Sequence, residues 1–205
     1  MIRSGLIGAL LSLTLAGAAA AEPFQSFADL CLSTDADAEA AKVVAKGSGW
    51  TDVTAQMGAD IGEEFQDTAV YLNFDPANVA SLSEGDSMDI LMTGWGDGEA
   101  IMGTNGVVLD VCGVMSPQAD AQAMSRQLTG HLGLPSSTKL GWTVWMYSRQ
   151  GGRFVSEAGL MEAGDERFLA ATRERSLYFV YLIEEDGLAG LVVGAVRPAA
   201  KAQDR

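Results

Sequence analysis

The sequence predicts an α+β fold, with a mostly antiparallel sheet of about six strands and helices packed on one face of it. Three pairs of strand-like segments are each joined by a short turn that contains glycine, and turns of this length connect antiparallel strands. Other segments carry apolar residues at helical spacing and end at a glycine. Residues 22–205 are enough for a single α+β domain with its own core.

Residues 1–21 are predicted to be a secretory signal peptide that precedes this domain. Arg3 comes before an apolar run over residues 6–15, and Ala19-Ala20-Ala21 supplies the small-residue cleavage pattern before Glu22. The apolar run is too short to span a membrane as a helix. We therefore expect a soluble protein without a membrane span, periplasmic or secreted, from which residues 1–21 are removed.

Two helices are expected at the start of the domain. Residues 24–31 carry apolar side chains at i, i+3 and i+7, which indicates a short amphipathic helix. A second helix is predicted to begin at a capping box formed by Thr34 and Asp37 and to end at Gly47. Its inner stripe consists of Ala38, Ala41 and Ala45.

Strand signals dominate from residue 88 onward, and one weaker strand candidate precedes them. Two isolated strands are predicted at residues 70–74 and 88–93. The three predicted hairpins pair residues 98–102 with 107–114 across Asn105-Gly106, 142–149 with 153–156 across Gly151-Gly152, and 177–183 with 188–196 across Asp186-Gly187. Trp142 and Trp145 should lie on opposite faces of their strand, because side chains alternate.

A further helix is predicted between the first and second hairpins. Ser116 would be its N-cap, Pro117 its first residue and Gly133 its end. Its buried stripe consists of Ala121, Met124, Leu128 and Leu132. Residues 166–174 fit either a strand or a short helix. We expect the core to contain Phe24, Phe27, Met124 and Leu128 together with the inward side chains of the hairpins.

The negative charge is concentrated in the first half of the domain. Residues 22–112 hold 17 acidic and 2 basic residues, whereas residues 113–205 hold 10 of each. This balance opposes binding to nucleic acid or anionic membranes. It fits either a solvated acidic face or a surface that attracts a basic exported protein or a divalent cation. In the neutral half, Arg167, Arg173 and Arg175 could pair with the acidic half across the fold.

Two acidic runs are candidates for such a cation. Asp35-x-Asp37-x-Glu39 is not an EF-hand loop, because Ala40 occupies the position that needs glycine. A looser calcium site could draw on carboxylates further along the chain, since hard cations need only several oxygens within reach. These carboxylates are Asp60, Glu63, Glu64 and Asp67. Neither run is specific enough for a metal ligand to be assigned.

Cys31 and Cys112 are the only cysteines, and exported compartments are oxidising. A Cys31–Cys112 disulfide is therefore the first expectation, and two buried thiols or an intermolecular bridge are the alternatives. The two cysteines do not form a C-x-x-C redox motif. With a single histidine, they are too few for a tetrahedral His/Cys zinc site.

Residues 94–98, Gly94-Trp95-Gly96-Asp97-Gly98, form the segment richest in glycine. They lack the Lys and Ser or Thr of a phosphate-binding loop, and a strand rather than a helix is predicted to follow. We expect a flexible turn or bulge between strands. The alternative is a loop in which Trp95 and Asp97 face a ligand.

No catalytic residue can be assigned. His131, the only imidazole, is predicted at the end of a helix, where the helix dipole favours a positive ring, and the chain has no G-x-S-x-G nucleophile motif. Among 27 acidic residues no pair stands out for general acid–base catalysis. Four methionines could line a patch suited to Cu(I), although methionine is also common on ordinary sheets. These are Met88, Met92, Met102 and Met115.

One set of features also forms a recognisable pattern along the chain. In chain order it comprises Phe27-x3-Cys31, an alanine-rich helix, Gly49-Trp50, Cys112, a helix beginning near Asp120, Leu132-Gly133, and a strand with Trp142 and Trp145. In this pattern the chain resembles a group of small exported bacterial proteins of unknown function. The resemblance implies a Cys31–Cys112 pairing and a single domain, and it implies no activity.

We therefore expect a non-enzymatic exported binding or interaction module, without a cofactor, whose acidic N-terminal half contacts its partner. The alternative is a small exported hydrolase that uses paired carboxylates. That alternative predicts a concave pocket with two acidic residues of perturbed pKa.

Overall fold

The computed structural model describes residues 23–58, 62, 64–81, 86, 88–139, 141–185 and 187–199. The predicted signal peptide lies outside this range, as do Asp60 and Glu63 of the looser cation site. The helical elements are α1 (Pro23–Phe27), the π-helical turn η1 (Ala28–Leu32), α2 (Ala38–Gly47), α3 (Thr54–Met57), η3 (Pro76–Ser81), α4 (Gly98–Met102), α5 (Ala121–Leu132), η4 (Ala158–Leu160) and α6 (Asp165–Glu174). The strands are β1 (Thr51–Asp52), β2 (Phe65–Leu72), β3 (Ile90–Asp97), β4 (Val107–Ser116), β5 (Ser137–Lys139), β6 (Trp142–Gln150), β7 (Arg153–Ser156), β8 (Leu177–Glu185) and β9 (Leu188–Pro198).

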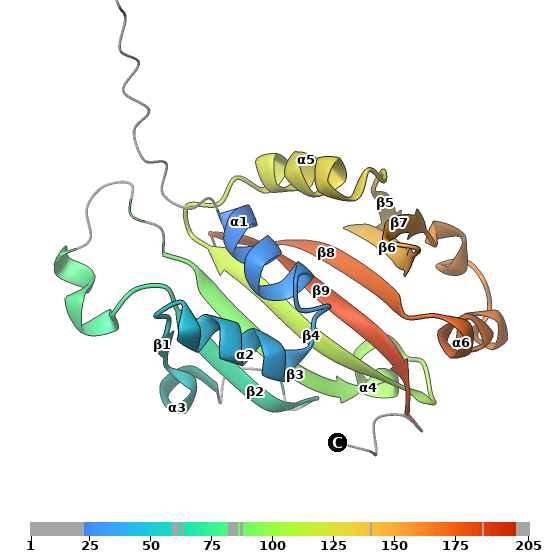
Figure 1. The fold of residues 1–205 in the computed structure, drawn as a ribbon, viewed down its shortest axis with the longest axis horizontal. Coiled ribbons are helices and arrows are strands. Elements are labelled where there is room, and N and C mark those ends of the chain that lie inside the picture. The colour runs from blue at the N-terminus through green and yellow to red at the C-terminus, as the bar shows by residue number, and fades with distance from the viewer. Residues whose placement is uncertain are drawn as a thin grey trace, which may run out of the picture.

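The predicted α+β class is confirmed, and the sheet is larger than expected. Nine described strands form one sheet in the order β1-β2-β3-β4-β9-β8-β6-β5, with β7 paired to β6, instead of about six. Each described strand pair is antiparallel. In Figure 1, β4 and β9 occupy the middle of the sheet, α1 and α2 lie over it, and α5 runs along its upper edge.

The first face of the sheet packs under α1, η1, α2 and α5. Cys112, Val193, Val180 and Trp145 lie opposite one another in the strand register and point to this face. They share a buried cluster with the predicted core residues Phe27, Met124 and Leu128, while Phe24 is half-buried at its edge. The Cys31–Cys112 disulfide is present there, with 5.4 Å between the two Cα atoms, and ties η1 to β4.

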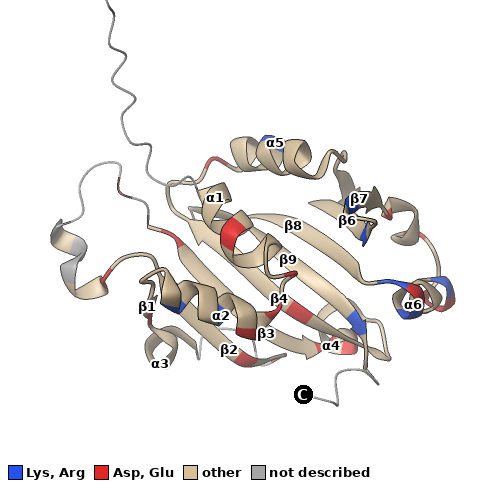
Figure 2. Cartoon of the chain, in the orientation of Figure 1, with Lys and Arg blue, Asp and Glu red and all other residues tan. Residues whose placement is uncertain are grey.

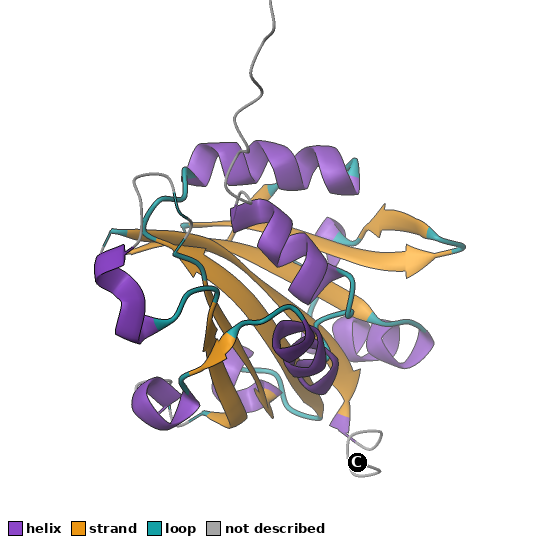
Figure 3. Ribbon diagram, turned by 60° about the vertical axis from the view of Figure 1, so that its left-hand side comes forward, coloured by secondary structure: helices purple, strands orange, loops and turns teal. Residues whose placement is uncertain are grey.

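Helices cover both faces of the sheet, whereas the sequence predicted them on one face only. Val107, Leu109 and Val196 point to the opposite side, which we call the second face, and pack with side chains of α4, η4 and α6. Figure 3 shows helices on both sides of the sheet. Alternation along a strand predicts two faces, but it does not say which helix covers which.

Two predicted helix starts are wrong. Asp37 alone caps α2, by accepting a hydrogen bond from Ala40 N, while the Thr34 hydroxyl donates back to the Leu30 carbonyl. Asp120 rather than Ser116 caps α5, because Ser116 belongs to β4. The predicted end of α5 at Gly133 is confirmed, since this glycine has a left-handed φ of 65°.

The glycine-rich segment is strand rather than a turn. β3 continues through it to Asp97, and residues 98–102 form α4 instead of the predicted strand. Gly94 and Gly96 permit this because β2 crowds them: a Cβ at Gly94 would come within 3.1 Å of the Gln66 carbonyl oxygen. The hairpin therefore joins β3 to β4.

The other two hairpins are confirmed. β6 and β7 meet at Gly151-Gly152, whose φ angles of 57° and 77° suit a primed turn, and β8 pairs directly with β9. Trp145 is buried and Trp142 is 44% exposed, as their opposite faces predict. The ambiguous residues 166–174 are helical, within α6.

Candidate functional site

Two hollows open on the second face of the sheet. One is a polar pocket between α6 and the chain that follows β7, and the other is an apolar groove over β2, β3, β4, β8 and β9. The two are built from different kinds of side chain.

The polar pocket forms where β7 ends. After Ser156 the chain turns into η4, which leaves Glu157 at the corner, and α6 runs past this corner. Residues 167, 170, 171 and 174 lie on one face of α6 and line the pocket, because they follow helical spacing. The pocket encloses about 320 Å³. Its polar lining consists of Ser156, Glu157, Arg167, Glu174 and Arg175.

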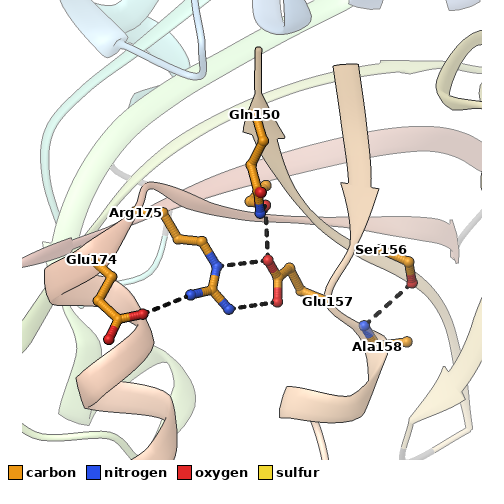
Figure 4. Close-up of polar contacts among 7 residues, drawn as sticks. Gln150, Ser156, Glu157, Ala158, Glu174 and Arg175 are labelled. Carbon is orange, nitrogen blue, oxygen red and sulfur yellow. Dashed lines mark hydrogen bonds and ion pairs between the residues drawn. The ribbon is translucent and has the colours of Figure 1, made fainter. Parts of the chain in front are cut away.

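Glu157 and Arg175 make a bidentate ion pair at the base of the pocket (Figure 4). Nε and Nη2 of Arg175 donate to Oε1 and Oε2 of Glu157 at 2.7 and 2.9 Å. The buried Ser148 hydroxyl donates to Oε1 at 2.8 Å, and Gln150 Nε2 donates to Ser148 in turn. The remaining guanidinium nitrogen, Nη1, contacts only Glu174, whose side chain is 72% exposed, at 3.1 Å among the described residues.

The pair fixes both charges. Hydrogen bonds from Arg175 and then from Ser148 lower the pKa of Glu157 below its ordinary value, against the opposing effect of burial. The hydrogen bond to Glu157 raises the pKa of Arg175. Glu157 is therefore an anion near neutral pH, and it serves to orient the guanidinium.

This chemistry does not favour a carboxylate-based hydrolase. The pocket does hold two acidic residues, as that alternative predicts, but both are bonded to Arg175. A general acid needs a pKa raised toward the working pH, and that of Glu157 moves the other way.

The apolar groove crosses the middle of the sheet and encloses about 190 Å³. Side chains from five strands line it, and the described lining contains no acidic or basic residue. Its larger side chains are Phe65, Met92, Val111, Met115, Ile183 and Val192.

Glycine keeps the floor of the groove low. Gly94 and Gly113 lie in its lining, on neighbouring strands. A Cβ at Gly113 would come within 2.7 Å of the Val192 side chain. Met92 and Met115 stand beside these glycines, so the lining combines a flat backbone floor with two flexible side chains.

The sequence-predicted ligand residues lie elsewhere. Trp95 points to the first face, where its Nε1 donates to Asp67 Oδ2 at 2.8 Å, and Asp97 caps α4 through Glu99 N. Neither residue lines the groove or the pocket. Strand alternation places Met92 and Gly94 on one face of β3, but it does not say which part of that face the helices leave open, so the sequence alone did not locate the groove.

The other candidate residues have structural partners. Asp35 pairs with Arg149 at 2.8 Å and Glu39 with Lys42, and in the described residues no group of three metal-ligating side chains comes together. Of the four methionines, Met92 and Met115 line the groove, and Met102 packs against the buried cluster of the second face. The His131 ring lies between those of Phe24 and Phe154, at centroid distances of 6.0 and 5.7 Å.

The charged halves do meet, but through other arginines than those expected. Arg149 reaches Asp35, and Arg197 reaches the buried Asp110 at 2.7 Å, whereas Arg175 pairs within its own half. Figure 2 shows acidic residues along β2, β3 and β4, and acidic and basic residues side by side on α6.

Among the described residues, no helix has the length and apolar character to cross a membrane. No family model, curated protein or solved structure matches the chain.

Proposed function

We propose that this protein is a non-enzymatic exported binding module whose apolar groove takes apolar side chains from a basic segment of another exported protein. The observation that carries the proposal is the groove itself, with its uncharged lining and glycine floor on an open part of a sheet face. The predicted signal peptide supports export.

The size of the groove favours a partner's side chains over a whole small molecule. Pockets for small molecules usually enclose about 300–1,000 Å³, and the groove encloses about 190 Å³. Methionine suits such a surface because its unbranched chain adapts to different shapes. A partner would insert side chains here and make further contacts around the rim.

Charge around the groove favours a basic partner. Two exposed carboxylates flank the lining along the chain, and the described lining holds no charge of its own. The exposed Glu64 precedes Phe65 of the lining, and the exposed Glu185 lies on the same face of β8 as Ile183. An apolar segment flanked by Lys or Arg matches both the lining and the rim.

The test uses three labelled peptides of equal length, with alternating Leu and Lys, Leu and Glu, or Ser and Lys. Fluorescence anisotropy should show binding of the Leu/Lys peptide only, weakening about ten-fold between low and physiological salt. Met92→Gln should weaken it several-fold. Met57→Gln is the matched control, because Met57 is exposed on α3 and lies outside the groove.

Four outcomes would overturn the proposal. Equal losses of peptide affinity in the Met92 and Met57 variants would exclude the groove as the binding site. Binding of the Leu/Glu peptide would exclude the preference for a basic partner. Salt-insensitive competition by a fatty acid would indicate a lipid ligand. Concentration-dependent dimerisation abolished by Met92→Gln would make a second copy of this chain the occupant.

A further inference from the structure

The polar pocket contains an oriented arginine side chain that neither the fold nor the groove requires. Its volume of about 320 Å³ lies in the range of small-molecule sites. At its base, Glu157 holds the half-buried guanidinium of Arg175 in place, and Nη1 of this guanidinium contacts the exposed Glu174.

The rigidity of Arg175 comes from three layers of hydrogen bonds. Glu157, only 9% exposed, binds two guanidinium nitrogens, Ser148 holds Glu157, and Gln150 holds Ser148. A guanidinium fixed in this way loses little conformational entropy when it binds a further anion.

The replaceable partner is Glu174. It neighbours Arg175 in the chain, and its side chain is 72% exposed. An exposed ion pair of this kind contributes little stability, because water and salt compete with it. A stronger anion could therefore take its place on Nη1.

A second guanidinium lines the same pocket. Arg167 lies about two helical turns before Arg175 and is exposed, and its guanidinium makes no hydrogen bond or ion pair with another described residue. Two arginines that share one cavity, one fixed and one free to move, are suited to a ligand with several anionic oxygens.

We propose that the pocket binds a small multiply charged anion, a phosphate or polycarboxylate compound, between Arg167 and Nη1 of Arg175, with Glu174 displaced into solvent. Glu157 and Ser148 are positioning residues in this site. The site is independent of the groove, since the two share no lining residue.

The experiment titrates inorganic phosphate and citrate into the purified protein at constant ionic strength, by isothermal titration calorimetry, with chloride as the reference anion. Saturable binding of phosphate alone would identify a phosphate site, and of citrate alone a carboxylate site. Arg167→Gln should weaken binding at least ten-fold. Glu174→Gln should strengthen it several-fold, because the competing carboxylate is removed.

Two variants on the same helix are matched controls. Arg173→Gln removes one positive charge, as Arg167→Gln does, and Glu166→Gln removes one negative charge, as Glu174→Gln does. Both control positions are exposed and lie outside the pocket, so both variants should leave the affinity for the anion within two-fold of wild type. The proposal is overturned if neither anion binds saturably, if the Arg173 variant weakens binding as much as the Arg167 variant, or if Glu174→Gln leaves binding unchanged. Thermal melts of each variant identify any loss of folding, and an unfolded Arg167 variant would be replaced by Arg167→Lys, for which we expect a several-fold loss.

Discussion

Loss of the Cys31–Cys112 disulfide should remove a large share of the stability of this domain. The bridge joins positions 81 residues apart. The loop-entropy relation gives a stabilisation of about 4–5 kcal/mol for a loop of this length at 25 °C. Domains of this size are stable by about 5–15 kcal/mol in total. The reduced protein should therefore unfold at clearly lower urea concentration, and its melting temperature should fall by about 8–20 °C.

The assay compares urea unfolding of the oxidised protein and of the protein fully reduced in denaturant, so that the amino-acid composition is unchanged. Because the reduced unfolded chain is less compact, the dependence of unfolding free energy on urea should also steepen. The control is the double variant Cys31→Ala, Cys112→Ala, whose unfolding should not respond to the reductant. A difference below about 1.5 kcal/mol between oxidised and reduced protein would refute the loop-closure reasoning.

Two further substitutions test the second face of the sheet. Glu157→Gln should cost about 2–3 kcal/mol, because Arg175 loses its carboxylate partner. The folded protein holds the pKa of Glu157 below its ordinary value of 4.5, so the stabilisation by the ion pair is fully present above pH 4.5 and is lost as the pH falls through the lowered pKa. The urea midpoints of wild type and variant should therefore converge at low pH. A difference between the two midpoints that persists at low pH would contradict the ion pair. Gly190→Ala should lower the free energy of unfolding by about 2–3 kcal/mol in thermal melts, because the added Cβ would collide with the Val114 carbonyl oxygen. Gly130→Ala is the control: it has open space around it on α5 and should raise the free energy of unfolding by about 0.5–1 kcal/mol. Equal melting temperatures for these two glycine variants would refute the β4–β9 register.

The features that sequence predicted correctly are decided locally. The turn at Gly151-Gly152 needs two positive φ angles, and adjacent glycines supply them whatever the rest of the fold does. The stripe containing Met124 and Leu128 is buried because helical spacing puts these residues on one side of α5. The disulfide was expected because the chain has only two cysteines and carries a predicted export signal.

The features that sequence missed depend on choices between local alternatives or on distant partners. Residues 98–102 precede an Asn-Gly turn, as the first strand of a hairpin would, but Asp97 and Gly103 cap them at both ends as a short helix. The pocket depends on Glu157 meeting Arg175 across 18 positions, and neither residue type is unusual in its surroundings. The groove depends on which part of the second face the short helices leave open, and strand alternation carries no information on that.

The electrostatics of the two hollows support recognition rather than proton transfer. A catalytic acid or base needs a pKa near the working pH, so that it can both hold and release a proton. In the pocket, Glu157 and Arg175 shift each other's pKa in opposite directions, away from neutrality, which fixes both charges. The described lining of the groove contains no acidic or basic residue at all. One hollow therefore offers fixed charge and the other offers apolar surface, and these are the properties by which a binding protein distinguishes its ligands.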